Sequence, residues 1–214
     1  MSADIMKLKN QTGAGIKDCK EALDNSKGDY EKAVAYLREK GKATASKKQD
    51  RIAAEGAVSS YIHAGGKIGV LVEINCETDF AAKNERFLEL CKNVGMQIAA
   101  SNPLYLDESE VPTHELEREK EILRNKARAE KKPDAIIEKM LEGQVKKYYG
   151  DICLIHQAFV KDPSKTIKDV VIETSAAIGE KVSIRRFVRY ELGAGIEKKT
   201  EDFATEVAKA AGKK

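Results

Sequence analysis

Two β-favouring stretches joined by paired glycines constrain the fold of this 214-residue chain more than any other feature. Residues 57–62 and 68–75 carry β-branched and aromatic side chains, and Gly65 and Gly66 lie between them. Glycine reaches the backbone angles that a tight turn requires, so the two stretches are predicted to pair as a hairpin. In the second stretch, alternation places one set of side chains on the buried face of a sheet: Ile68, Val70, Val72 and Ile74.

The first forty residues have a helical spacing instead. Apolar side chains recur every three or four positions in residues 3–10, 16–26 and 29–40, which predicts three short helices packed as a small bundle. Gly28 is a natural helix stop, and Asp29 is a natural N-cap for the third helix. The stripes predicted to be buried comprise Ile5, Leu8, Ile16, Cys19, Ala22, Leu23, Ala33, Val34 and Leu37.

Residues 42–51 are locally basic and lack large apolar side chains until Ile52. We interpret them as a linker or as an exposed extension of the third helix. A lysine run of this kind is more often a solvated surface than a binding patch. RNA binding here is an alternative that the lack of aromatic stacking residues disfavours.

The rest of the chain alternates between helical and extended patterns. An amphipathic helix is predicted to cover the sheet with a stripe of Phe87, Leu88, Cys91, Val94 and Ile98. Two charge-rich helices, residues 113–131 and 134–148, are predicted to form a helical hairpin around Pro133. Beyond them we expect an extended segment at 152–160, a helix from Pro163 to residue 178 and a strand at 182–191 that joins the earlier hairpin.

Together these patterns predict an α+β fold in four regions. Residues 1–41 form a three-helix domain and residues 42–55 a linker. Residues 56–199 form an α+β core, in which helices cover a small antiparallel sheet and which includes the helical hairpin 113–148. Residues 200–214 form a C-terminal helical module, an amphipathic helix too short to be stable alone.

Composition excludes several classes of protein. Thirty-eight Lys and Arg against 35 Asp and Glu leave a net charge of +3, which favours protein partners over direct nucleic-acid binding. The four cysteines form no C-x-x-C pair and the three histidines lack metal-finger spacing, so we expect a reduced, metal-free protein. The sequence shows no signal segment, no apolar run near the about 20 residues that cross a bilayer, and no catalytic or phosphate-loop motif. We therefore expect a cytoplasmic protein away from membranes that is not an enzyme and holds no cofactor.

Residues 76–84, Cys-Glu-Thr-Asp-Phe-Ala-Ala-Lys-Asn, are the most informative segment because they leave a buried strand and enter a helix. One interpretation is ordinary capping, in which Thr78 or Asn84 is the N-cap, Asp79 suits the positive end of the helix and Phe80 packs inward. The other is that Phe80 projects as an apolar anchor, worth roughly 1.5–3 kcal/mol if a partner buries it.

Several ordered motifs resemble those of the elongation factor Ts family. The N-terminal ones are Thr-Gly-Ala-Gly at 12–15, Asp-Cys-Lys-Glu-Ala-Leu at 18–23 and Leu-Arg-Glu-Lys-Gly at 37–41. Residues 75–84 resemble the family's Thr-Asp-Phe motif, and 142–143, 163–166 and 185–193 are similar to its later landmarks. The resemblance covers nearly the whole chain.

That resemblance implies a ubiquitin-associated-type three-helix module, a helix-covered antiparallel core and a C-terminal helical piece. It implies a guanine nucleotide exchange factor that binds elongation factor Tu, GDP-bound and nucleotide-free, and promotes GDP release. Thr78, Asp79 and Phe80 would enter between helices of the GTPase and disturb its magnesium and phosphate site. Further partner contacts implied by the family are Lys9, Ile16, Lys17 and Lys20 in the first module, then Lys48, His63 and Val160.

Two departures from the family pattern change these expectations. Family members often have an apolar residue at the positions of Lys17 and Lys161, so we expect those contacts to be altered or absent here. Long members carry two copies of the sheet-and-helix unit, whereas this chain has material for one, which leaves an edge and a face of the sheet uncovered. We therefore expect a homodimer. The alternative function is a general protein-interaction adaptor that uses the ubiquitin-associated-like domain.

Overall fold

The computed structural model describes residues 2–48 and 50–196, and the predicted C-terminal helix at 200–214 lies outside this range. Three helices open the chain: α1 (Ser2–Thr12), α2 (Ile16–Asn25) and α3 (Tyr30–Ser46). Gly28 has a φ of 82° and its N–H donates to the Leu23 carbonyl, which ends α2 as predicted. The core of this N-terminal bundle consists of Leu8, Cys19, Ala22, Leu23, Ala33 and Leu37.

One detail of the bundle differs from the prediction. Ile16 does not belong to the buried stripe, since 54% of it is exposed at the first residue of α2. α3 continues to Ser46, so the first part of residues 42–51 is the helical extension that was one of the two alternatives for this stretch. The bundle then docks on the core, where Arg38 Nε lies 3.3 Å from Glu173 Oε1.

A three-stranded antiparallel sheet forms the core, as predicted. Its strands are β1 (Glu55–His63), β2 (Ile68–Cys76) and β5 (Ser183–Glu191), in the order β1-β2-β5. The short helix η1 (Ala64–Gly66) makes the turn between β1 and β2, and Gly65 and Gly66 both have positive φ there. β5 begins 107 positions after the end of β2 and joins the hairpin with a register shift between Glu73 and Ile74.

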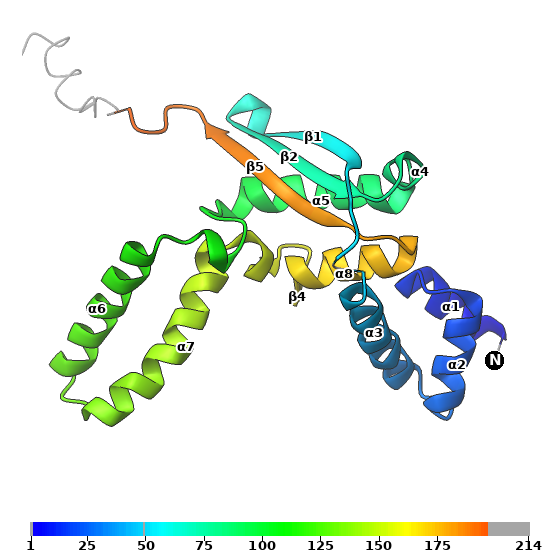
Figure 1. Ribbon diagram of the computed structural model, residues 1–214, viewed down its shortest axis with the longest axis horizontal. Coiled ribbons are helices and arrows are strands. Elements are labelled where there is room, and N and C mark those ends of the chain that lie inside the picture. Colours follow the sequence, from blue (N-terminus) through cyan, green and yellow to red (C-terminus); the bar gives the residue numbers. More distant parts are fainter. Residues whose placement is uncertain (1, 49, 197–214) are drawn as a thin grey trace, which may run out of the picture.

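Helix α5 (Glu85–Ser101) covers one face of this sheet, and α8 (Ile167–Ile178) packs against α5 (Figure 1). Leu90 is buried at this interface, whereas Leu88, predicted to face the core, is 51% exposed. The predicted apolar stripe of this helix therefore included one residue too many, Leu88. Side chains buried in this core include Val70, Val72, Ile74, Phe87, Leu90, Val94, Ile98, Leu154, Ile167 and Ile184.

The opposite face of the sheet stays exposed. Side chains alternate between the two faces along each strand, and Leu71 pairs with Ser60 on one side and with Val188 on the other. One row of apolar side chains therefore crosses the open face. The exposed apolar residues of this open face are Val58, Ile62, Leu71, Val188 and Tyr190.

A helical hairpin extends from the core, built by α6 (Thr113–Ala129) and α7 (Asp134–Ile152). Figure 1 shows it at the lower left and the N-terminal bundle at the lower right, at opposite ends of the central layer. Leu123, Ala127, Ile137 and Leu141 form the hairpin's own small cluster. The hairpin and its Pro133 boundary agree with the prediction. None of the described helices combines the length and apolar character needed to span a membrane.

The segment from residue 152 to 178 differs most from the prediction. It contains the short helix η3 (Leu154–His156) and two short paired strands, β3 (Ala158–Phe159) and β4 (Asp162–Thr166). A further short helix, η2 (Glu108–Glu110), precedes α6. Pro163 lies in β4, and α8 begins only at Ile167. The physical reason is the capping box at Thr166, whose hydroxyl accepts from the Asp169 N–H and whose own N–H donates to the Asp169 carboxylate.

Candidate functional site

Residues 78–80, here called the tip, follow one residue after the end of β2 and include the start of the one-turn helix α4 (Asp79–Ala82). The Thr78 hydroxyl accepts from the Ala81 N–H at 3.2 Å and so caps α4. Asn84 caps the next helix, since its Oδ1 accepts from the Arg86 N–H at 2.9 Å. The two candidate caps of the sequence therefore both serve, each for a different helix.

Phe80 points away from the protein, with 79% of it exposed. The inward-packing interpretation is wrong because Ala81, not Phe80, is the buried residue of α4. The Lys83 ammonium lies 5.8 Å from the centre of the Phe80 ring and 2.9 Å from Asp79 Oδ2. This contact holds the pKa of Asp79 below its usual range, so the tip presents an aromatic ring beside a carboxylate.

Glu180, which sequence reasoning missed, holds the tip from across the fold. Its carboxylate accepts from the Glu77 N–H at 3.1 Å, from the Thr78 N–H at 3.0 Å and from the Thr78 hydroxyl at 2.7 Å. Glu180 follows Gly179, whose φ of 84° ends α8. The only sequence signal is an acidic residue after a helix-ending glycine, which does not reveal a partner 102 positions away.

A second group of predicted contacts lies on the N-terminal bundle. Lys9 is in the last turn of α1, and Ile16, Lys17 and Lys20 are in the first two turns of α2. All four are exposed, so an apolar side chain is flanked by three lysines near the loop between α1 and α2. Such a surface suits a partner with carboxylates around an apolar spot.

Lys48 differs from these lysines because it is used inside the protein. It is buried, and its Nζ donates to the Gly179 carbonyl at 2.6 Å. That bond satisfies the C-terminal end of α8, where a cation is favourable. Its structural role is visible, and its role as a partner contact stays a prediction.

The last two predicted contacts lie away from the tip. His63 is exposed at the β1–β2 turn, with its Nδ1 3.2 Å from the Tyr61 hydroxyl. β2 separates this turn from the tip by eight residue steps, or about 26 Å. Val160 is exposed between β3 and β4, and its N–H donates to Gln97 Oε1 at 2.9 Å. The neighbouring Lys161 bonds to Asn93 Oδ1 at 2.7 Å.

One group of potential metal ligands comes together in the described part of the chain. The ligand atoms of Asp107, Glu108 and His156 lie within 4.8 Å of one another at the base of the helical hairpin. Asp107 already bonds to His156 Nε2 at 3.2 Å and caps the Glu108 N–H, so the group closes the hairpin base without an ion. The expected absence of a metal stays a prediction.

The four cysteines are buried and free. Burial raises the pKa of Cys91 and of Cys153 to about 11, which disfavours the nucleophilic thiolate. These thiols therefore serve as packing residues in this structure.

Comparison with known proteins agrees with these motifs. The family model described as Elongation factor TS matches residues 3–194. The chain is 61% identical over 211 residues to Elongation factor Ts of Geotalea daltonii, covering 99% of this chain and 98% of that one. It is 59% identical to Elongation factor Ts of Geobacter metallireducens, over the same shares, and 54% identical to that of Heliobacterium modesticaldum over 96% of both chains. This chain belongs to the elongation factor Ts family.

Proposed function

We propose that this protein is the guanine nucleotide exchange factor for elongation factor Tu. The observation that carries the proposal is the exposed Phe80 ring, held on a capped one-turn helix beside Asp79. A large apolar side chain left in water at a fixed position is the usual form of a binding anchor. The family name of the relatives supports a role in translation elongation.

The mechanism that we propose is a wedge. A GTPase holds its nucleotide through backbone amides around the phosphates and through a magnesium ion. Phe80 and Asp79 enter beside that site. The ring acts through its apolar burial and the carboxylate through its charge, and together they weaken the binding of the phosphates and of the magnesium ion. Because linkage is reciprocal, a factor that prefers the empty GTPase must lower GDP affinity by the same ratio. The factor needs no cofactor of its own.

The exposed residues of the N-terminal bundle supply a second contact in this proposal. Lys9, Ile16, Lys17 and Lys20 bind an outer helix of the same GTPase domain, while His63 and Val160 reach other parts of the partner. Two contacts on one rigid chain raise the effective concentration of each for its target. The tip then acts on a partner that is already docked.

Phe80→Ala tests the proposal. Loss of an apolar anchor of roughly 1.5–3 kcal/mol predicts a fall in stimulated GDP release of about 10- to 100-fold. The measurement is the release of a fluorescent GDP analogue from elongation factor Tu. Ile122→Ala is the control, because Ile122 is also an exposed apolar residue but lies on α6 of the hairpin.

Normal exchange by Phe80→Ala would show that the ring is not the anchor. If the wild-type protein instead captures ubiquitin-like proteins and leaves GDP release unchanged, the adaptor function replaces this one. Since the ring is exposed, the variant is expected to unfold at the wild-type urea concentration.

We also propose that two copies associate through the open face of the sheet. Val58, Leu71 and Tyr190 expose apolar surface there, and in the described part of the chain β1 and β5 each pair on one side only. A two-fold axis through this face would bury the same row on both copies. We also propose that the protein acts in the cytoplasm, away from membranes, and that it does not bind nucleic acids directly.

A further inference from the structure

We infer that Glu77 and Glu180 form a reciprocal clamp that positions the tip and fixes its place relative to the N-terminal bundle, so that Glu180 is a positioning residue for nucleotide exchange. The inference rests on the proposed function, because the tip is taken as the acting element. It assigns a role to two half-buried acidic groups that bind other parts of this chain and do not touch the partner in the proposed mechanism.

The first half of the clamp is the Glu180 carboxylate. It accepts three hydrogen bonds, from the N–H groups of Glu77 and Thr78 and from the Thr78 hydroxyl, at 2.7 to 3.1 Å. These donors are the last groups before α4 begins. Charge-assisted bonds of this kind are stronger than neutral ones and strongly directional.

The second half runs in the opposite direction. Glu77 Oε1 accepts from the Lys181 N–H at 2.6 Å, and both Glu77 oxygens lie 3.2 to 3.3 Å from Arg51 Nη1. Residues 77 and 180 thus each use a carboxylate to bind the backbone of the other's segment. Such an exchange fixes both the distance and the rotation between the two loops.

The same loops bind the segment that leads from the N-terminal bundle. Lys48 Nζ donates to the Gly179 carbonyl at 2.6 Å, and Lys181 Nζ donates to the Arg51 carbonyl at 2.9 Å. Lys48 and Arg51, residues 77–78 and residues 179–181 therefore meet at one junction. Through it, the bundle and the tip are held in a defined relative position.

The tip needs this support because its own helix is too short to hold it. α4 has four residues, well below the length at which an isolated helix is stable, and only the small side chains of Ala81 and, in part, Ala82 pack against the core. Without the clamp, Phe80 would be ordered only on binding. That ordering would lower the affinity for the partner and the rate at which the ring enters it. A clamped tip avoids that cost in advance.

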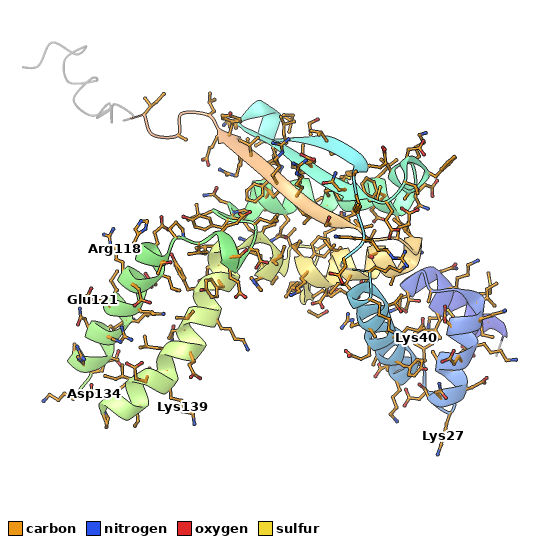
Figure 2. All side chains as sticks on the ribbon, viewed as in Figure 1. Lys27, Lys40, Arg118, Glu121, Asp134 and Lys139 are labelled. Atoms are coloured by element: carbon orange, nitrogen blue, oxygen red, sulfur yellow. The ribbon has the colours of Figure 1, made fainter. Side chains whose placement is uncertain are left out.

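Glu180→Gln is the primary test. The amide keeps the shape but removes the charge, and only one of its two terminal atoms can still accept a hydrogen bond. We expect a roughly tenfold lower kcat/KM for exchange, and faster hydrogen exchange at the Thr78 and Ala81 amides with unchanged exchange in β2. Glu121→Gln is the matched control, because Glu121 lies on the hairpin, far from α4 (Figure 2).

A double-mutant cycle separates positioning from general structural damage. If Glu180 acts through Phe80, then Glu180→Gln should cost little in a Phe80→Ala background, whereas a merely structural defect would add in full. Full additivity, or wild-type exchange by Glu180→Gln, overturns the clamp. If Phe80→Ala stimulates GDP release at the wild-type rate, the proposed function is overturned instead, because the ring is then not the anchor.

A second variant keeps the test valid if Glu180→Gln does not fold. Glu77→Gln removes the charge from the opposite half of the clamp and leaves the three bonds to Glu180 in place. It should lower exchange in the same direction and again be non-additive with Phe80→Ala. Wild-type exchange by a folded Glu77→Gln would also overturn the clamp.

Discussion

The carboxylates of Glu77 and Asp79 remain charged at lower pH than usual because both accept strong hydrogen bonds. The N–H of Lys181 lowers the pKa of Glu77, with Arg51 contributing further, and the Lys83 ammonium lowers that of Asp79. A carboxylate that is stabilised in the folded state and not in the unfolded state makes folding depend on pH. At the scale of single residues, the clamp should therefore be weakened by acid.

Acid unfolding of Glu77→Gln tests this effect. The folded pKa of Glu77 lies below its ordinary value of 4.5, so its contribution is complete above that pH and is lost as pH falls through the folded pKa. Between about pH 6 and pH 3, the urea midpoint of the wild type should fall further than that of the variant. Parallel curves for the two proteins would show that Glu77 does not contribute to the pH dependence.

At the scale of elements, the start of α8 is set by a capping group and not by the nearby proline. Pro163 is compatible with a helix start, yet α8 begins at Ile167 because Thr166 and Asp169 satisfy each other's backbone N–H groups. Likewise, Thr78 and Asn84 divide one predicted helix start into α4 and α5. The break between those caps is what leaves Phe80 exposed.

Thr166→Ala should therefore destabilise the protein by about 1 kcal/mol, since it removes the capping hydroxyl of α8. Thermal unfolding followed by circular dichroism measures the change. Thr44→Ala is the control, because the Thr44 hydroxyl bonds to the Lys40 carbonyl within its own helix and caps nothing. Equal effects of the two substitutions would contradict the capping role of Thr166.

At the scale of the whole molecule, the sheet has one covered and one open face. α5 covers the first, while the second exposes an apolar row across all three strands. Two leucines of similar exposure sample the two sides: Leu71 on the open face is 48% exposed, and Leu88 on the outer side of α5 is 51% exposed. They allow a matched test of the proposed dimer.

Light scattering after size exclusion should give a wild-type mass twice the 23.6 kDa of one chain. Leu71→Lys should shift the mass toward a single chain, because it places a charge in the proposed interface. Leu88→Lys should leave the mass unchanged. A monomeric wild type, or equal masses for the two variants, would rule out association through this face.

Much of the architecture was predictable because it depends on local patterns. The alternation of Val70, Val72 and Ile74 identified the covered face of β2, and Gly28 and Pro133 marked element ends correctly. Several ordered motifs, among them the one at residues 75–84, together indicated the family. These signals are local because backbone angles and the period of apolar residues are set by near neighbours in the chain.

Tertiary structure alone decided which side of α4 faces the solvent and what holds it there. The pattern of residues 76–84 was compatible with Phe80 inside or outside, and the outcome depended on Ala81 filling the core. The bonds from Thr78 to Glu180 and from Lys48 to Gly179 join residues 102 and 131 positions apart. Such pairings form when whole elements pack together. The sequence around a side chain does not indicate which distant group that side chain will contact.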